Sequence, residues 1–290
     1  MLNAAEPRRP KRPPRSLRSE YDEFIDQRIE EYKDALPRAE ILSIGDEAVV
    51  ELGRTQQYQL TEVVLTEQVD AIIRRRLKLP TFRRWREGHI ARRAAQAEPS
   101  HWGLAPHEPI VTLADVIEDQ DLILVIGASD GACALFLAAR GAEVTVVDPD
   151  LVAIGGLENR AIVEDLGGRI RCRVEGLARF APDQCPFVAC VIETIAVADL
   201  SPPERAALIQ RLKEETPSDG RHVVMPGSPM RGGGVSKLSS DALRSLYSDW
   251  SVVRPPLGSG SASGRRPRNV GFIAIRVESR QSETPLAVSK

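Results

Sequence analysis

Residues 122–150 read LILVIGASDGACALFLAARGAEVTVVDPD, and this stretch decides the fold. The apolar run at 122–126 predicts a buried strand, residues 132–140 predict a helix that stops at Gly141, and 143–147 predict a second strand. A strand, a helix and a second strand in this order make a βαβ unit, whose two strands are parallel.

The sequence that follows continues the alternation of strands and helices. Strands are predicted at 170–174, 188–192 and 222–225, and SPPERAALIQRLKEE (201–215) predicts a helix with a serine cap and prolines in its first turn. Two further strands, predicted at 250–253 and 270–277, are expected to form an antiparallel pair. The prediction is therefore an α/β, Rossmann-like fold: a mostly parallel seven-stranded sheet with an antiparallel last strand and helices on both faces.

The N-terminal part of the chain has a different pattern. Residues 1–18 are rich in proline and arginine and have almost nothing to bury, so they predict a disordered basic tail. Helical spacing of apolar residues begins after Ser19, and 19–110 is predicted to be a helical accessory or lid region. The α/β domain is expected at 111–278 and a flexible tail at 279–290.

The composition excludes several classes of protein. With 42% hydrophobic and 28% charged residues in 290, the chain is neither collagen-like nor wholly disordered. The longest apolar region, 122–139, is interrupted by Ser129, Asp130 and two glycines, whereas a membrane span needs about 20 mostly apolar residues. The N-terminus lacks the apolar segment of a signal peptide, so we expect a cytoplasmic protein without membrane contact. The four cysteines and four histidines are scattered, and we predict no metal site.

Nucleic-acid binding would need a local patch, because the net charge is only −2. Residues 74–86, RRRLKLPTFRRWR, form such a patch, here called the basic cluster, in which Phe82 and Trp85 lie among arginines. This mixture can grip phosphates and stack a base. A solvated helix face is the alternative interpretation.

The chemistry is expected at the carboxyl ends of the strands, where open α/β sheets bind ligands. In the loop after the first predicted strand, Gly127, Ser129 and Gly131 are small enough for a ligand to approach the backbone, and the next helix offers unpaired N–H groups. Asp148 can accept hydrogen bonds from both hydroxyls of a ribose. This pattern indicates a nucleoside-bearing cofactor. Alternatively, the glycines only make a tight turn and Asp148 caps the following segment.

Three segments resemble the class I S-adenosylmethionine-dependent methyltransferases: VIGASDG (125–131), VVDPD (146–150) and VIETIAVADLSPPERAALIQRLKEETPSDGRHVVMPGS (191–228). The similarity covers roughly 113–277. It implies a methyltransferase that uses S-adenosylmethionine as its cofactor. The methyl acceptor is not identified: a small molecule, a protein and RNA all fit.

The resemblance also implies site residues. The implied cofactor contacts are Gly127, Ala128, Ser129, Asp130 and Gly131 in the first loop, Asp148 and Pro149 after the second strand, Glu175, Gly176 and Leu177 after the third, and Glu193 after the fourth. Glu193 and Thr194 are the catalytic candidates, because the end of the fourth strand faces the methyl group and the acceptor. Glu193 would be a general base or an orienting group, with a structural salt bridge as the alternative.

The sequence departs from the family at Val125, where many members carry an acid that accepts from the cofactor's ammonium. Losing such a charge-assisted hydrogen bond costs about 1.5–3 kcal/mol. Asp130 or a backbone carbonyl could substitute for the acid. A degenerate member is the other possibility: a non-catalytic scaffold that binds RNA or a protein through its basic N-terminal region.

An NAD(P)-dependent oxidoreductase is a further alternative. It is disfavoured, because a GxGxxG pattern laid from Gly127 puts Ser129 and Ala132 at its second and third glycines. No Tyr-x-x-x-Lys pair follows the fourth predicted strand.

Overall fold

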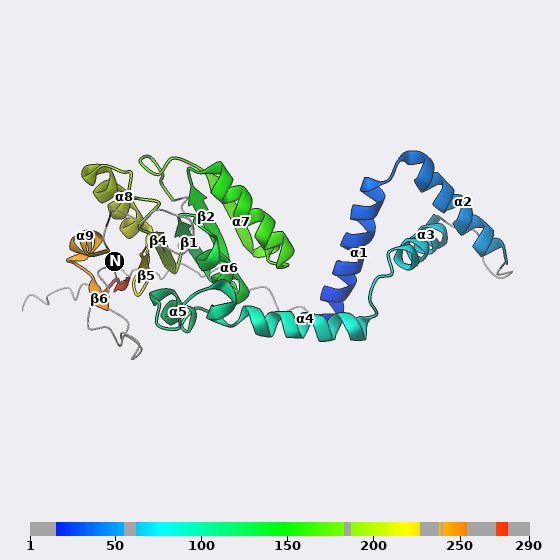
Figure 1. Cartoon of the computed structure of the whole chain (residues 1–290), viewed down its shortest axis with the longest axis horizontal. Helices are drawn as coiled ribbons and strands as arrows, with labels where there is room; N and C mark the ends of the chain where they lie inside the picture. Colours follow the sequence, from blue (N-terminus) through cyan, green and yellow to red (C-terminus); the bar gives the residue numbers. More distant parts are fainter. Residues whose placement is uncertain are drawn as a thin grey trace, which may run out of the picture. The chain divides into compact units, whose positions relative to one another are not determined.

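The computed structural model describes residues 16–54, 62–182, 187–226, 238, 240–253 and 271–277. They form two compact units that divide between Arg93 and Ala94. The first is helical and is here called the helical unit; the second contains a sheet flanked by helices and is called the sheet unit (Figure 1). No helix among these residues is both long and apolar enough to cross a membrane.

The helical unit consists of α1 (Leu17–Ala35), α2 (Arg38–Arg54), α3 (Glu62–Arg76) and most of α4 (Phe82–Gln96). Its buried core is made of Tyr21, Ile25, Ile29, Ile44, Ala48, Ile72, Ile73 and Trp85. The first helix begins before Ser19 because the side chain of Ser16 accepts a hydrogen bond from Ser19 N and caps it. Leu17 and Arg18, which the sequence assigns to the tail, are therefore helical; residues 1–15 and 278–290 lie outside the described residues.

The sheet unit is built on seven strands in the order β3-β2-β1-β4-β5-β7-β6. The strands are β1 (Leu122–Ile126), β2 (Glu143–Asp148), β3 (Ile170–Val174), β4 (Ala189–Glu193), β5 (Arg221–Met225), β6 (Ser251–Val253) and β7 (Phe272–Ile275). The first five are parallel, and β7 lies antiparallel between β5 and β6. The predicted fold class is confirmed.

Helices cover both faces of this sheet (Figure 1). One core packs α5 (Pro109–Ala114), α6 (Ala132–Ala139) and α7 (Leu151–Val163) on the sheet; the other packs α8 (Pro202–Glu215) and α9 (Ser240–Arg244). We call them the α6-side core and the α8-side core. Short 3-10 turns, η1 (Pro99–Trp102), η2 (Gly167–Arg169) and η4 (Ser245–Tyr247), join these elements.

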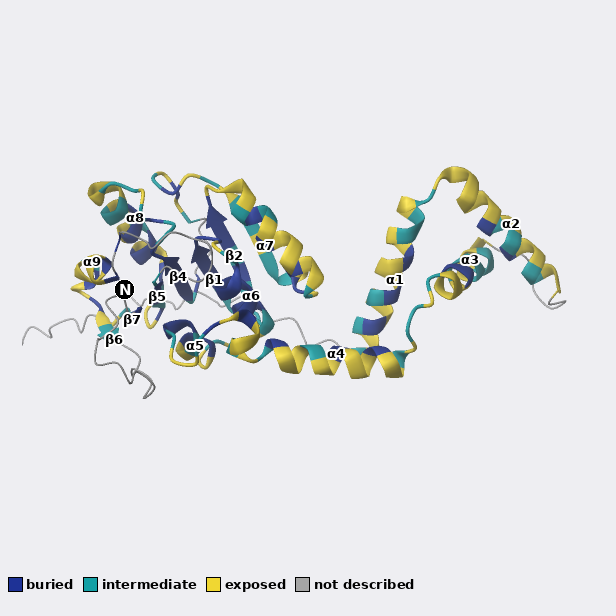
Figure 2. Cartoon of the chain, viewed as in Figure 1, coloured by how far each residue is buried: buried dark blue, intermediate teal, exposed yellow. Residues whose placement is uncertain are grey.

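Strand β1 shows why the two-layer arrangement follows from sequence. Side chains alternate across a strand, so Ile123 and Val125 enter the α6-side core while Leu124 and Ile126 enter the α8-side core. A strand buried on both faces is apolar throughout, as the dark central strands in Figure 2 show. Trp102, which precedes the predicted domain start at 111, is also buried in the α6-side core.

Candidate functional site

The strand order reverses between β1 and β4, and both strands end at the same edge of the sheet. Ile126 and Ile192 are paired in register, so the next residues, Gly127 and Glu193, are neighbours where the strands end. Ligands bind open α/β sheets at such a reversal. This edge is therefore the candidate site.

The bend after β1 has a left-handed backbone at three residues: φ is +107° at Gly127, +32° at Ser129 and +73° at Gly131. Space also requires the two glycines. A Cβ at Gly127 would lie 2.8 Å from Ala196 Cβ, and one at Gly131 would lie 2.7 Å from Leu157 Cδ1. The protein's own packing therefore accounts for both glycines, as the tight-turn interpretation predicts, and they are no evidence for a ligand by themselves.

Asp148 lies at the end of β2 and is only 7% exposed. Its Oδ2 accepts a hydrogen bond from Ala128 N and its Oδ1 accepts one from Asp150 N, both at 2.7 Å. A carboxylate has about four lone-pair sites, so acceptor capacity remains after these two bonds. Among the described residues no ion pair involves Asp148.

The helix after β2 has its own cap, which bears on the alternative interpretation of Asp148. Asp150 is the N-cap of α7, and its side chain accepts from Val152 N at 2.8 Å and Ala153 N at 3.3 Å. Asp148 holds the bend of β1 to the start of this segment rather than capping the helix. Pro149, between the two acids, is exposed.

Glu193 and Ser129 meet across the two strand ends. Glu193 ends β4, is 6% exposed, and its Oε2 accepts a hydrogen bond from the Ser129 hydroxyl. Thr194 is fully buried, and its backbone N–H donates to Met225 O at 2.9 Å, which fixes the end of β4 against β5. The structure thus brings Ser129, Glu193 and Asp148 to one edge.

The residues predicted to lie near an adenine follow β3. The carboxylate of Glu175 pairs with Arg173 at 2.8 Å, and its backbone N–H donates to Asp148 O at 3.2 Å. Leu177 is buried in the α8-side core. Gly176 is exposed, and a Cβ there would meet nothing within 4 Å. Open space at this end of the edge is therefore found beside Gly176, while Leu177 belongs to the core.

Two residues concern the acid that the resemblance implies at position 125 and that this sequence lacks. Val125 is fully buried in the α6-side core, so the position carries no polar group toward the edge. Asp130 is engaged just before α6: its Oδ1 accepts a hydrogen bond at 3.1 Å from the backbone nitrogen of Ala132, the first residue of that helix. Its backbone carbonyl accepts a hydrogen bond from the guanidinium of Arg160, a contact across the chain that nothing in the sequence indicates.

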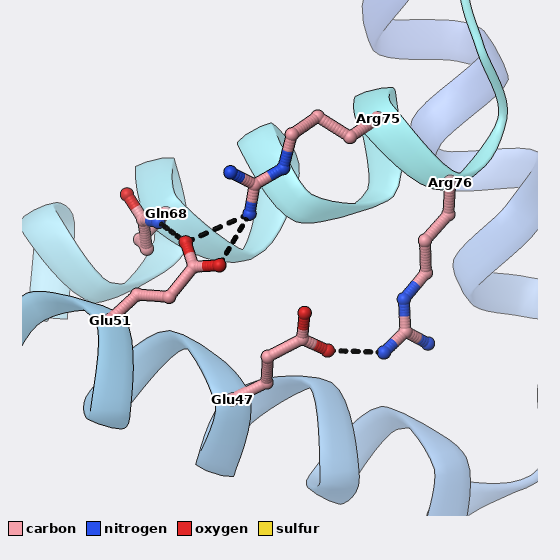
Figure 3. A network of polar contacts seen from close by, with 5 residues as sticks. All are labelled: Glu47, Glu51, Gln68, Arg75 and Arg76. Carbon is pink, nitrogen blue, oxygen red and sulfur yellow. Dashed lines mark hydrogen bonds and ion pairs between the residues drawn. The ribbon is translucent and has the colours of Figure 1, made fainter.

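The basic cluster of the helical unit is partly neutralised by acids of α2 (Figure 3). Arg75 pairs with Glu51 at 2.8 Å, Gln68 also donates to Glu51, and Arg76 pairs with Glu47. These pairs reduce the positive potential that a phosphate backbone would meet. The solvated-face interpretation accounts for these contacts.

The aromatic residues of the basic cluster have a packing role. Trp85 is 8% exposed, and its ring lies 4.5 Å from His89 and 5.5 Å from Tyr21, centroid to centroid. Phe82 is partly buried against the same core. A base would have to displace these neighbours to stack on Trp85, so the predicted stacking platform is absent at this residue.

No family model matches the sequence, and no curated protein matches it significantly. The structure resembles the N-methyltransferase NodS from Bradyrhizobium japonicum WM9, with 17% identity and a TM-score of 0.45 over 58% of this chain and 93% of that one. It also resembles a TehB-like SAM-dependent methyltransferase from Corynebacterium glutamicum, with 16% identity and a TM-score of 0.43 over 68% of this chain and 95% of that one.

A third similar structure is the glycopeptide N-methyltransferase MtfA in complex with S-adenosylmethionine. Identity is 14% and the TM-score is 0.44, over 59% of this chain and 93% of that one. At such identities similarity describes a fold and leaves the chemistry to the residues. Any assignment of function therefore depends on the side chains of this chain.

Proposed function

We propose that this protein is an S-adenosylmethionine-dependent methyltransferase whose cofactor binds over the carboxyl edge of β1, β2 and β4. The observation that carries the proposal is the burial of Asp148 together with its incomplete set of hydrogen-bond donors. The residue is only 7% exposed, yet its neighbours in the described chain supply its carboxylate with two backbone N–H groups and no cation. A buried carboxylate is costly unless it is well bonded, and a ribose diol would supply the two further donors.

The donors and acceptors at this edge fit the parts of the cofactor. We assign Asp148 to the ribose hydroxyls, and the open side at Gly176, with Pro149 and Glu175, to the adenine; Leu177, packed in the α8-side core, supports this side from below the surface. The bend, Gly127, Ala128, Ser129, Asp130 and Gly131, is assigned to the amino-acid part, since the N-terminus of α6 follows it and backbone N–H groups there attract a carboxylate.

When bound, S-adenosylmethionine supplies a methyl group on a positively charged sulfur, which is already activated for transfer. The chain then has to hold the acceptor in line and exclude water. We assign Glu193 and Thr194 to the border between cofactor and acceptor. Thr194 is fully buried, so it would position the end of β4 rather than exchange a proton.

The acceptor stays unidentified, and a small molecule, a protein or RNA would each satisfy the proposal. We further propose that the helical region 19–110 selects it. The absence of an acid at Val125 is the observation that favours the competing candidate, a methyltransferase-like scaffold without activity. Cofactor binding distinguishes the methyltransferase from the scaffold, because only the methyltransferase needs a ribose at the remaining acceptor sites of Asp148.

A thermal-shift comparison of ligands tests the proposal. S-adenosylhomocysteine should raise the melting temperature of the full chain in a concentration-dependent way, because a ligand that binds only the folded state stabilises it. NADH and NADPH should leave it unchanged. Stabilisation by a dinucleotide alone would support an oxidoreductase, and no response to any of the three would support the scaffold.

A further inference from the structure

We infer that Glu193 binds the ammonium group of the cofactor and so replaces the acid that position 125 lacks; the inference depends on the proposed function. The amino-acid part of S-adenosylmethionine and of S-adenosylhomocysteine carries an α-ammonium. Such a group is bound best by a carboxylate, through charge-assisted hydrogen bonds. The question is which acid at the edge can supply it.

Position 125 cannot supply the acceptor for the ammonium, even if the strand moves slightly. Val125 is fully buried in the α6-side core and pairs in register with Val146 and Val191 on the neighbouring strands. A side chain there points among apolar neighbours. The acceptor therefore has to come from another element that ends at the same edge.

Most acids near the edge are committed to other contacts. Asp130 accepts a hydrogen bond from Ala132 N at the start of α6, and Asp150 caps α7 through the N–H groups of Val152 and Ala153. Glu175 is paired with Arg173. Asp148 lies on the β2 side and is assigned to the ribose. Glu193 is the acid that stands directly across the reversal from the bend.

The position of the Glu193 carboxylate fits an ammonium at the bend. Its Oε2 lies 3.3 Å from the point where Gly127 would carry a Cβ, so the charge faces the first residue of the bend. Glu193 already accepts a hydrogen bond from the Ser129 hydroxyl, which shows that the carboxylate takes donors from this side. Glu193 is only 6% exposed, so water screens its charge poorly and its attraction for a cation is correspondingly strong.

This assignment changes the role expected of Glu193. A carboxylate that is bonded to an ammonium has its charged form stabilised, so it is a weaker base than an unbonded one. Glu193 is then a cofactor-binding residue, and the proton of the acceptor has to leave by another route.

Calorimetric titration with two ligands tests the inference. One is S-adenosylhomocysteine; the other is its deaminated analogue S-adenosyl-4-thiobutyrate, which lacks only the ammonium. The wild-type chain should prefer S-adenosylhomocysteine. Glu193→Gln keeps the shape of the side chain and removes its charge, so it should weaken S-adenosylhomocysteine by about ten- to a hundred-fold and leave the analogue nearly unchanged.

Asp130→Asn tests the competing acid of the same loop. Because Asp130 is itself assigned to the amino-acid part, this variant is judged by its preference between the two ligands and not by its affinity. It should keep the wild-type preference. The inference is overturned if Glu193→Gln keeps the preference, if Asp130→Asn abolishes it, or if Glu193→Gln loses both ligands equally. If the wild-type chain binds S-adenosylhomocysteine but does not prefer it, only this inference fails. If the wild-type chain binds neither ligand, the proposed function fails as well.

Discussion

The Oδ2 atom of Asp148 accepts a hydrogen bond from the backbone nitrogen of Ala128 at 2.7 Å, which ties the end of β2 to the bend after β1. Its other oxygen accepts from Asp150 N at the same distance. Asp148 is thus part of the scaffold of the edge as well as the group assigned to a ribose, and the two roles have separable consequences.

Replacing Asp148 by alanine should destabilise the protein even without a ligand. The change leaves the buried N–H of Ala128 and the part-buried N–H of Asp150 without their acceptor. An unsatisfied buried donor costs about 1–3 kcal/mol, and one that water can reach costs less. We expect Asp148→Ala to lower the free energy of unfolding by about 2–4 kcal/mol in urea titrations, and Asp148→Asn to lower it less, because an amide oxygen still accepts. Equal stability of the alanine variant and the wild type would show that these bonds are weak.

A side chain at position 127 should disturb the bend in two ways. Gly127→Ala places a methyl group against Ala196 and puts an L-residue at φ +107°, and such backbone strain costs about 1–3 kcal/mol. We expect a lower urea midpoint. Adding Ala196→Gly should remove only the clash with Ala196, because the backbone strain and the 3.0 Å approach to Glu193 Cβ remain. Full recovery in the double variant would mean that φ contributes nothing.

The stability of the sheet unit should depend on pH through His222. This residue is fully buried, with Nε2 2.8 Å from Thr216 Oγ1 and Nδ1 2.8 Å from Tyr247 Oη. Burial, and then the positive charges of Lys213 and Arg276, lower the pKa of His222 to about 3 from 6.5.

The sign of the effect follows from that lowered pKa. The unfolded chain takes up a proton at His222 below about pH 6.5, while the folded chain resists it until about pH 3, so stability falls as the pH drops between these values. Between pH 7 and 5 the wild type should lose about 2 kcal/mol more than His222→Gln. Parallel pH profiles of the two proteins, measured by urea unfolding, would contradict the buried neutral histidine.

The basic cluster should bind RNA weakly, because Glu47 and Glu51 pair with two of its arginines. Replacing both glutamates by glutamine should strengthen salt-dependent binding of a single-stranded RNA, measured by fluorescence anisotropy, since two cations become available to phosphates. The same change should cost little stability, because water and salt screen ion pairs between exposed side chains. Tight RNA binding by the wild type, unchanged in the variant, would favour the scaffold hypothesis.

The sheet could be predicted well from the sequence because its strands are buried on both faces. Residues 122–126 were expected to form a strand, and β1 has these bounds; the other six predicted strands have counterparts within a few residues. Such strands appear in the sequence as short apolar runs, independent of which strands they pair with. Local pattern was therefore enough for the fold class.

Other features could not be predicted locally. Within the helical region 19–110 the bounds of α2 could not be predicted, because its exposed Leu42 and Val50 break the amphipathic pattern. The contact of Ser129 with Glu193 depends on the register of β1 against β4, which residues far apart in the sequence decide. The ion pair of Glu51 with Arg75 is a tertiary contact of the same kind. Candidate residues were thus found from the sequence, but not their partners.

The most direct measurement of the central claim is the affinity of S-adenosylhomocysteine for Asp148→Asn and for Asp150→Asn, by isothermal titration calorimetry. Each change removes one negative charge, and the two acids are separated only by Pro149. Asp150, however, caps α7, a role that asparagine fills equally well. We predict that Asp148→Asn weakens binding at least about ten-fold, the effect of losing about 1.4 kcal/mol, and that Asp150→Asn binds like the wild type. Unchanged affinity in Asp148→Asn would contradict the assignment of this edge to the cofactor.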